Sequence, residues 1–332
     1  MKRIFAAVLC LVMIFALMTA MSVNASADGD PYVYMALAHN MAEDHAVNKA
    51  LTQWAQEVNE KSGGSIEIEI FFGGTLGSET ECLQQVQQGT LEMTKVSAGS
   101  LDSFVPEWNA LSVPYVFNDR DHLYKVMNSD IAQDMYMLSE DQGFVGLTWL
   151  ESGVRCFYTK NTPIRTPNDL KGLKIRTMQS QMAIAMMKAF DASSTAQSYS
   201  EAITAMSTGV IDGAENNVTA LRDFIDCTKY YCYDEHTMIP DIIVISSNVW
   251  NSLTDNQKKI LQETAVDMTA NYRQLWADFE DEVIKLATDK GIEFITDVDK
   301  AAFQDAVKGI YTDLEQNSPS TYEFVKRIQE AA

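Results

Sequence analysis

Residues 65–97 have the sequence SIEIEIFFGGTLGSETECLQQVQQGTLEMTKVS, in which a strand, a helix and a second strand follow one another. Isoleucine alternates with glutamate over residues 66–70, the pattern of a half-buried strand, and two glycines follow soon after. A helix over Glu79–Gln88 then leads to a strand over Leu91–Ser97. Because a helix that joins two neighbouring strands places them in parallel, this stretch predicts an α/β fold with a parallel sheet covered by helices.

The same alternation of short apolar runs and helical patterns continues on both sides of this stretch. Before it lie a strand at Tyr32–Ala38 and a helix at about Asp44–Lys61. After it we expect strands at Phe144–Leu150, Leu173–Arg176, Val210–Ala214 and Asp241–Ser247, and helices at Asp121–Asp141, Ser180–Phe190 and Ser200–Ser207. A chain of 332 residues usually divides into two lobes. Since no low-complexity linker separates the predicted elements, sheet crossovers should join the lobes.

One predicted helix is much longer than the others. It begins with a capping box at Thr254-Asp255-Asn256-Gln257 and continues to Gly291, with apolar residues every three or four positions. A helix of more than 30 residues is about 45 Å long at 1.5 Å per residue. It should therefore pack along more than one lobe.

The first residues predict export. Lys2 and Arg3 precede an apolar run from Ile4 to Ala20, and a stretch of small residues ends in Ala25-Ser26-Ala27. These are the parts of a secretory signal peptide over residues 1–27, so we expect a periplasmic or otherwise extracytoplasmic protein. A retained membrane anchor is the alternative, since about 18 apolar residues can span a bilayer.

The formal net charge of −21 narrows the range of partners. A surface this acidic argues against nucleic acid and against anionic membranes, both of which attract cationic proteins. It does not exclude an anionic ligand, because buried arginines dominate the local potential inside a desolvated cleft.

Motifs of enzymes and metal sites are scarce. The sequence lacks the G-x-S-x-G, H-E-x-x-H, Walker and G-x-G-x-x-G patterns, so we expect no catalytic residues and no cofactor. His39 and His45 flank two acids in a spacing that fits no common metal site, and we interpret them as solvated loop residues. Glu79 and Glu81 lie two positions apart at a helix start and point in different directions, which disfavours an acid/base pair.

The cysteines leave the redox state open. Cys82, Cys156, Cys227 and Cys232 follow the signal segment and allow three disulfide pairings, among them Cys227–Cys232. A chain of this size does not need a disulfide, however, and a buried free thiol behaves as a small apolar side chain. Cys10 lies inside the apolar run instead of at its end, which disfavours a lipoprotein.

Five short motifs are distributed along the chain. They are Glu60-Lys61-Ser62-Gly63-Gly64, Thr75-Leu76-Gly77-Ser78-Glu79, Val113-Pro114-Tyr115-Val116-Phe117, Asp169-Leu170-Lys171-Gly172-Leu173-Lys174-Ile175-Arg176 and Gly209-Val210-Ile211-Asp212-Gly213-Ala214-Glu215-Asn216-Asn217. The last two are specific in combination. With them, nearly the whole mature chain resembles the solute-binding proteins of TRAP transporters (DctP type), the extracytoplasmic receptors of ion-driven importers of organic acids.

The resemblance implies the architecture and the partners. Relatives of this family have a periplasmic-binding-protein-like fold, in which two α/β lobes close on a ligand and a long helix crosses both. On this basis residues 28–150 belong mainly to the first lobe and residues 151–248 mainly to the second. Residues 249–332 form the long helix and the C-terminal helices on both lobes. The implied partners are a small carboxylate and the TRAP membrane subunits.

The resemblance also implies the ligand anchor. An arginine in the place of Arg176 holds the ligand's carboxylate, and a guanidinium offers two parallel donors that match its two oxygens. A side chain that packs its stem and extends its head into solvent is the alternative. Arg155 matches a second arginine that faces the cleft and Asn216 matches the family's cleft asparagine, while Gln179 should lie beside them.

Other polar residues fall at positions that should line the cleft: His39, Asn40, Glu79, Ser97, Ser100, Glu215, His236 and Asp241. Glu79 would repel a second carboxylate but would accept hydrogen bonds from sugar hydroxyls. Met178-Gln179-Ser180 and Asp234-Glu235-His236 are similar to the uronate-binding branch of the family. The resemblance therefore favours a hexuronate such as D-glucuronate or D-galacturonate, or a related aldonate. Asn217 departs from the proline often found there, at the pocket's edge.

Three other readings stay open. The ligand can instead be a four-carbon dicarboxylate or a keto acid. An exported enzyme acting on sugar acids would require turnover and an acid/base pair with shifted pKa values. The same capture chemistry could also serve a sensor, in which case a kinase would replace the transporter as the partner.

Overall fold

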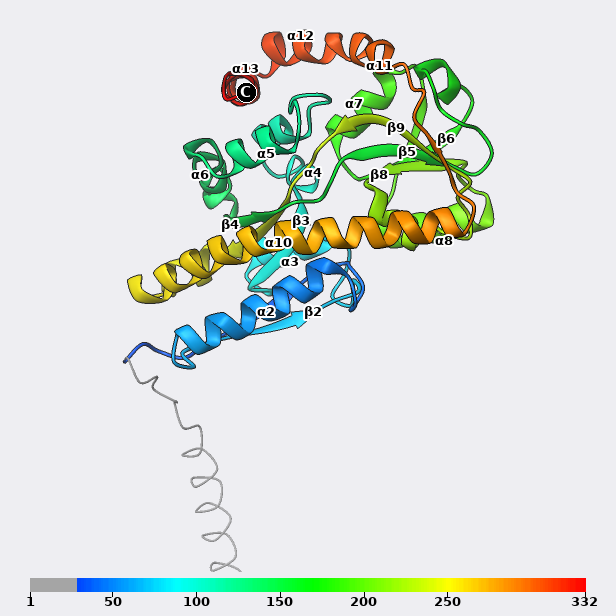
Figure 1. Cartoon of the computed structure of the whole chain (residues 1–332). Helices are drawn as coiled ribbons and strands as arrows, with labels where there is room; N and C mark the ends of the chain where they lie inside the picture. Colours follow the sequence, from blue (N-terminus) through cyan, green and yellow to red (C-terminus); the bar gives the residue numbers. More distant parts are fainter. Residues whose placement is uncertain (1–28) are drawn as a thin grey trace, which may run out of the picture.

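A computed structural model describes residues 29–332 as two mixed sheets, each flanked by helices (Figure 1). The predicted signal peptide lies outside these residues. Within residues 29–332, no helix combines the length and the apolar character needed to cross a membrane. The two sheets are the cores of two lobes, which confirms the predicted two-lobed α/β class.

The first sheet has the strand order β2-β1-β3-β10-β4. The bounds are β1 Val33–Ala38, β2 Ile66–Phe71, β3 Met93–Ser97, β4 Phe144–Leu150 and β10 Asp241–Ser246. Strands β1, β2 and β3 are parallel, as predicted, and are connected by α2 (Ala46–Lys61) and α3 (Glu79–Gln88). Strand β10 is antiparallel to both of its neighbours, so the sheet is mixed.

The second sheet has the strand order β11-β9-β5-β8-β6-β7. The bounds are β5 Arg155–Thr159, β6 Lys174–Thr177, β7 Ser193–Ala196, β8 Gly213–Asn216, β9 Tyr230–Thr237 and β11 Glu293–Ile295. Helices α7 (Gln181–Ala189) and α8 (Tyr199–Thr208) connect the parallel strands β6, β7 and β8. Strand β5 is antiparallel to β8 and β9, so this sheet is mixed as well.

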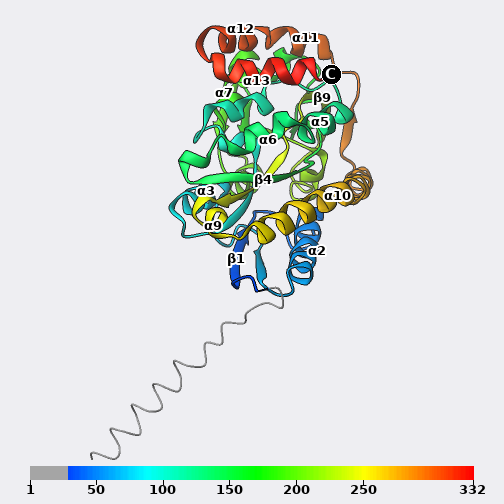
Figure 2. The same cartoon turned by 90° about the vertical axis from the view of Figure 1, so that its left-hand side faces the viewer.

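The remaining elements are short, apart from one. Their bounds are α4 Ala98–Leu101, η1 Pro106–Ser112, α5 Arg120–Met127, α6 Asp130–Met137, η2 Glu140–Gln142, η3 Pro167–Leu170, η4 Val218–Arg222, α9 Ser247–Ser252, α11 Lys300–Ala306, α12 Lys308–Asn317 and α13 Pro319–Glu330. Helix α13 packs on η1 and α6, α12 packs on α7, and α11 packs on β9. These last three helices lie together on one side of the molecule, opposite α2 (Figure 2).

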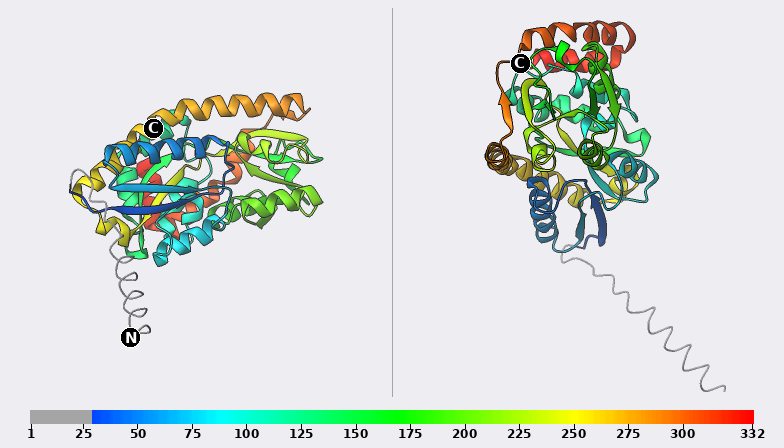
Figure 3. Two further views of the ribbon diagram at one scale, coloured as in Figure 1. Left: turned by 90° about the horizontal axis from the view of Figure 1, so that it is seen from below. Right: turned by 90° about the vertical axis from the view of Figure 1, so that its right-hand side faces the viewer.

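Helix α10 (Asp255–Asp289) is the predicted long helix. Its capping box forms between Thr254 and Gln257, and its 35 residues give a length of about 52 Å. It runs across the molecule (Figure 1) and lies beside α2 (Figure 3). It packs on α2, β4 and η4, and therefore on elements of both lobes.

Three connections cross between the sheets: residues 151–154 from β4 to β5, residues 238–240 from β9 to β10, and α10 itself. In the first connection Gly153 has φ +67° and lies against α10. A Cβ atom there would be 2.7 Å from Glu280 Oε1. Only glycine combines this backbone angle with so close an approach, so the crossover is held tightly against the long helix.

The structure corrects three predictions of secondary structure. The strand expected over Val210–Ala214 begins later, because residues 210–212 form a bend after the C-cap Gly209, and β8 spans Gly213–Asn216. The single helix expected over Asp121–Asp141 is divided into α5 and α6, because Ser129 ends one turn and caps the next helix through the backbone N–H of Ile131. The strands expected to be all parallel are not, because β5 and β10 enter their sheets through the crossovers and run in the opposite direction.

Candidate ligand-binding site

A cavity of about 550 Å³ lies between the lobes. The first lobe contributes side chains from α3, β3, β10 and the loop after β1, and the second contributes β5, β6, β8 and the start of α8. Ligands of open α/β sheets bind outside the carboxyl ends of the strands, and Ser97, Arg176 and Asn216 all lie at or next to such ends.

Most of the predicted site residues line this cavity. They are Asn40, Glu79, Ser97, Ser100, Arg155, Arg176, Gln179, Asn216 and Asp241. The other three, His39, Glu215 and His236, are buried behind the lining and are absent from it. Their predicted contact with the ligand is therefore not supported directly, and they act on the cavity through the residues that they hold.

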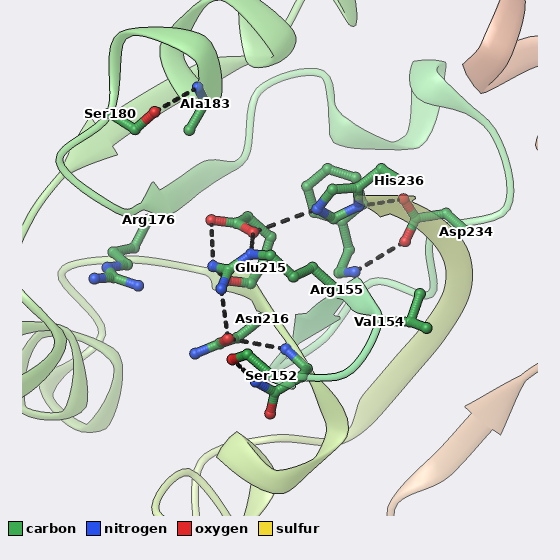
Figure 4. Close-up of polar contacts among 12 residues, drawn as sticks. Ser152, Val154, Arg155, Arg176, Ser180, Ala183, Glu215, Asn216, Asp234 and His236 are labelled. Carbon is green, nitrogen blue, oxygen red and sulfur yellow. Dashed lines mark hydrogen bonds and ion pairs between the residues drawn. The ribbon is translucent and has the colours of Figure 1, made fainter. Parts of the chain in front are cut away.

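Arg155 makes four hydrogen bonds to Glu215 and Asn216. Its Nε and Nη2 atoms donate to the two Glu215 carboxylate oxygens at 2.6 and 2.9 Å, and Nη2 also donates to the Glu215 carbonyl at 2.9 Å. Nη1 donates to Asn216 Oδ1 at 2.7 Å. The register explains the pairing, because β5 and β8 are antiparallel neighbours (Figure 4). Glu215 thus neutralises Arg155 and orients Asn216 through it.

His236 continues this network away from the cavity. Its Nδ1 lies 2.6 Å from Asp234 Oδ2 and its Nε2 lies 3.3 Å from Glu215 Oε2, with all three side chains buried (Figure 4). Burial disfavours the charged imidazole, but the Asp234 and Glu215 carboxylates outweigh burial and raise the pKa of His236 to about 9. The chain Arg155–Glu215–His236–Asp234 is therefore two buried cations alternating with two carboxylates.

Protonation of His236 should make stability depend on pH. Its pKa of about 9 lies above the ordinary value of 6.5, so its contribution is complete below pH 6.5 and is lost as pH rises through about 9. The loss should reach about 3 kcal/mol of unfolding free energy, at 1.36 kcal/mol per pKa unit. Urea denaturation of the ligand-free protein across this range measures it. In Asp234→Asn, which keeps the side chain's shape, the loss should shrink, and parallel curves for the two proteins would rule the assignment out.

Arg176 differs from Arg155 in its partners. It is 3% exposed, and its Nε and Nη2 atoms donate only to the backbone carbonyl of Gln197, at 3.0 and 2.6 Å. Within residues 29–332, no carboxylate lies within ion-pair distance of it, and burial lowers the pKa of its guanidinium. Figure 4 shows it beside the Arg155 network but without an interaction to the other residues drawn. The alternative of a solvated head is wrong, and the cavity contains a buried cation without a counterion.

Lys95, which belongs to no recognised motif, lines the first-lobe side of the cavity with Glu79 and Asp241. Its Nζ lies 2.8 Å from Asp241 Oδ2 and 3.6 Å from Glu79 Oε1, and its side chain is 1% exposed. Burial would lower the pKa of Lys95, but the two carboxylates outweigh it and raise that pKa. Burial also raises the pKa of Asp241, against the effect of Lys95. We treat the pair as ionised because the 2.8 Å contact is that of a charged hydrogen bond.

The interpretation of His39 and His45 as solvated residues is wrong. His39 is 3% exposed and bonds Asn48, and His45 is 8% exposed and caps α2 at the backbone N–H of Val47. Burial and then the charge of Lys95 lower the pKa of His39 to about 4 and that of His45 to about 3. Both rings are therefore neutral. His45 lines the cavity and stacks edge-on against Phe279.

Other lining residues carry no motif that would have identified them. They include Met41, Ser152, Gln197, Ser198, Tyr199, Thr219 and Trp276, whereas Asn217, expected at the pocket's edge, does line the cavity. Trp276 comes from α10, so the long helix itself contributes to the cavity. The acceptors Asn40 Oδ1 and Gln197 Oε1 are buried and have no hydrogen-bond partner in residues 29–332. Such groups are available to a ligand with hydroxyl donors.

The cysteines and possible metal ligands add no chemistry to the cavity. Cys82, Cys156, Cys227 and Cys232 are all free thiols, so the Cys227–Cys232 pairing that the sequence allowed is not formed. Within the described part of the chain, no group of three or more His, Cys, Asp or Glu side chains has an arrangement that could hold a metal ion.

Comparison with known proteins identifies the family. A family model described as bacterial extracellular solute-binding protein, family 7 (DctP) matches residues 37–317. The uncharacterised protein YiiZ of Salmonella typhimurium is 39% identical over 91% of this chain and 92% of its own length.

Solved structures agree in fold. A TRAP periplasmic solute-binding protein from Anaerococcus prevotii, with bound D-glucuronate, is 30% identical with a TM-score of 0.87 and covers 90% of this chain and 98% of its own. One from Xanthobacter autotrophicus, with bound β-D-galacturonate, is 33% identical with a TM-score of 0.86 and covers 90% and 100%. These matches confirm the resemblance that the sequence motifs indicated. The chain belongs to the bacterial extracellular solute-binding proteins of family 7, the solute receptors of TRAP transporters.

Proposed function

We propose that this chain captures a hexuronate such as D-glucuronate or D-galacturonate outside the cytoplasm and delivers it, unchanged, to the membrane subunits of a TRAP transporter. One observation carries the proposal. Arg176 is a buried cation that lines a polar cavity, and its only partner among residues 29–332 is a backbone carbonyl. A cation in this position is unfavourable until an anion enters, which makes it the anchor for a carboxylate.

The carboxylate end of the ligand matches Arg176 in geometry as well as in charge. A guanidinium presents parallel N–H groups to the two oxygens of a carboxylate, and such bidentate pairs are among the stronger hydrogen-bonded contacts in proteins. Gln197 occupies Nε and Nη2, so Nη1 and one Nη2 hydrogen are left for the ligand. Asn216, held by Arg155, lies in the same lining and can donate through its amide nitrogen.

The rest of the cavity suits hydroxyl groups. Glu79 and Asp241 supply charged acceptors, and Lys95 supplies a donor. The side-chain oxygens of Asn40 and Gln197 supply neutral acceptors without a partner in the described part of the chain. A sugar acid satisfies such groups with hydroxyls, whereas a four-carbon dicarboxylate offers few. The two solved relatives described above hold hexuronates, which supports the same ligand class here.

The receptor role without catalysis rests on the family and on the lining. The carboxyl groups in the cavity are each held by a hydroxyl, an ammonium or a backbone group: Glu79 by Ser100 at 2.7 Å and by the N–H of Ser97 at 3.3 Å, and Asp241 by Lys95. Because the protein already holds these carboxyl groups through hydrogen bonds and an ion pair, we interpret them as groups that bind the ligand and not as acids that transfer a proton to it. Export through the predicted signal peptide of residues 1–27 fits a receptor that works outside the cytoplasm.

A thermal-shift screen of the mature protein tests the proposal. A ligand that binds only the folded state stabilises it by mass action, about 4 kcal/mol at 1,000 times its dissociation constant. D-glucuronate or D-galacturonate should raise the melting temperature, while succinate and keto acids should not. Stabilisation by dicarboxylates alone would keep the receptor role and overturn the ligand. Conversion of the sugar acid, followed by NMR of the same mixture, would instead indicate an enzyme.

A further inference from the structure

Lys95 is a fully buried lysine that lines the cavity, and its charge is already paired with carboxylates of the protein. Asp241 on β10 and Glu79 on α3 both lie within ion-pair distance of its Nζ, so the three side chains together carry one positive and two negative charges. We call Lys95, Glu79 and Asp241 the lysine triad. Its excess of negative charge is unusual for a protein that binds an anion.

The other two cations of the lining, Arg155 and Arg176, differ in whether a carboxylate of the protein pairs with them. Arg155 is neutralised by Glu215, which it contacts through three hydrogen bonds. Arg176 alone lacks a carboxylate partner among the described residues. Glu81 and Glu201, the remaining lining carboxylates, cap their own helices through Ser78 and Ser198 and add negative charge at the rim. The cavity therefore has one buried cation without a carboxylate partner among the described residues, Arg176 on the second lobe, and a lysine triad with a net charge of −1 on the first lobe.

We infer that this charge arrangement makes the receptor select acids with one carboxylate, and that the lysine triad rejects ligands that carry a second carboxylate at the opposite end. This inference rests on the proposed function and sharpens it. A hexuronate would place its carboxylate on Arg176 and its uncharged hydroxyl-bearing end against the triad. A C6 aldarate, which has the same carbon skeleton with a carboxylate at each end, would place its second charge against Glu79 and Asp241.

The chemistry of the triad favours hydroxyls. Glu79 and Asp241 accept hydrogen bonds from hydroxyl groups, and Lys95 can donate its remaining N–H to a hydroxyl or ring oxygen. A second carboxylate can only accept, so it would add no donor to those that Glu79 and Asp241 already have from the protein, and it would bring a like charge next to them. Lys95 cannot compensate, because its single charge is already shared between these two acids. Like charges brought together in a desolvated site are strongly disfavoured, which is how a binding site excludes a competitor of the same shape.

Calorimetric titration with D-glucuronate and D-glucarate near neutral pH tests the inference. The mature wild-type protein should bind glucuronate at least about thirtyfold more tightly than glucarate. In Glu79→Gln, and independently in Asp241→Asn, this ratio should fall at least about tenfold, because each change removes one negative charge and keeps the side chain's shape. Glu69→Gln is the matched control, since Glu69 is exposed on β2 and bonds Tyr34 outside the cavity, and its ratio should equal that of the wild type.

Each outcome separates the inference from the proposed function. If the wild type binds both acids equally tightly, the inference is overturned while the uronate receptor stands. If the wild-type ratio is large but unchanged in both Glu79→Gln and Asp241→Asn, the triad is not its cause. If neither acid binds, the proposed function fails and the inference fails with it. Thermal unfolding establishes whether each variant is folded. If one of the two variants does not fold, the affinity ratio measured in the other decides the test.

Discussion

Arg176→Met is expected to weaken hexuronate binding at least about thirtyfold. Removing one partner of a buried charge pair costs about 2–5 kcal/mol, and each 1.4 kcal/mol is a factor of ten in the dissociation constant. The ligand-free protein should be no less stable than wild type, because the only described partner of Arg176 is the Gln197 carbonyl and methionine removes a buried, uncompensated charge. Loss of affinity without loss of stability is the signature of a residue kept for its ligand.

Calorimetric titration and urea denaturation of the same preparations measure the two quantities. Arg165→Met is the control, because Arg165 makes an exposed ion pair with Asp297 and does not line the cavity. Its affinity should equal that of the wild type. Near-normal affinity in Arg176→Met would mean that the ligand's carboxylate is held elsewhere. A large drop in its ligand-free stability would mean that Arg176 is a structural residue.

Much of the fold was predictable because its signals are local. Helix α3 was predicted with its observed bounds, and the capping box at Thr254 marks the start of α10. Alternation of isoleucine and glutamate gave β2, whose outward face carries the glutamates. These features depend on side chains within a few residues of one another, so no knowledge of the tertiary structure is needed to find them.

The strands of the second lobe show where local signals end. Strand β9 includes the buried residues Asp234 and His236, which have the composition of a loop. They are tolerated inside because Asp234 accepts from the N–H of Phe157 and His236 approaches Glu215, which lie 77 and 21 positions away. Lys95 escaped prediction for the same reason, since its partner Asp241 is 146 positions away. Burial of a charge depends on its partner, and the partner is a property of the fold.

Arg155→Met is expected to destabilise the ligand-free protein by about 3–5 kcal/mol, because it leaves Glu215 buried without its main cation. Glu215→Leu should cost a similar amount by leaving Arg155 unpaired. The double variant Arg155→Met/Glu215→Leu should lose clearly less than the sum of the two, with a coupling of about 1–3 kcal/mol. His236 keeps Asp234 as its partner in all three proteins. Urea denaturation of the four proteins completes the cycle.

Additive losses in this cycle would show that Arg155 and Glu215 are not energetically paired. If the double variant loses less than the sum of the two single variants, and Arg176→Met keeps the wild-type stability, then the two arginines of this cavity have different roles. Both are buried and both line the site. Arg155 has a carboxylate of the protein, so its removal damages the fold, and its effect on the ligand passes through Asn216. Arg176 has none within residues 29–332, so we expect that the fold does not need its charge and that, as proposed, the ligand brings the missing carboxylate.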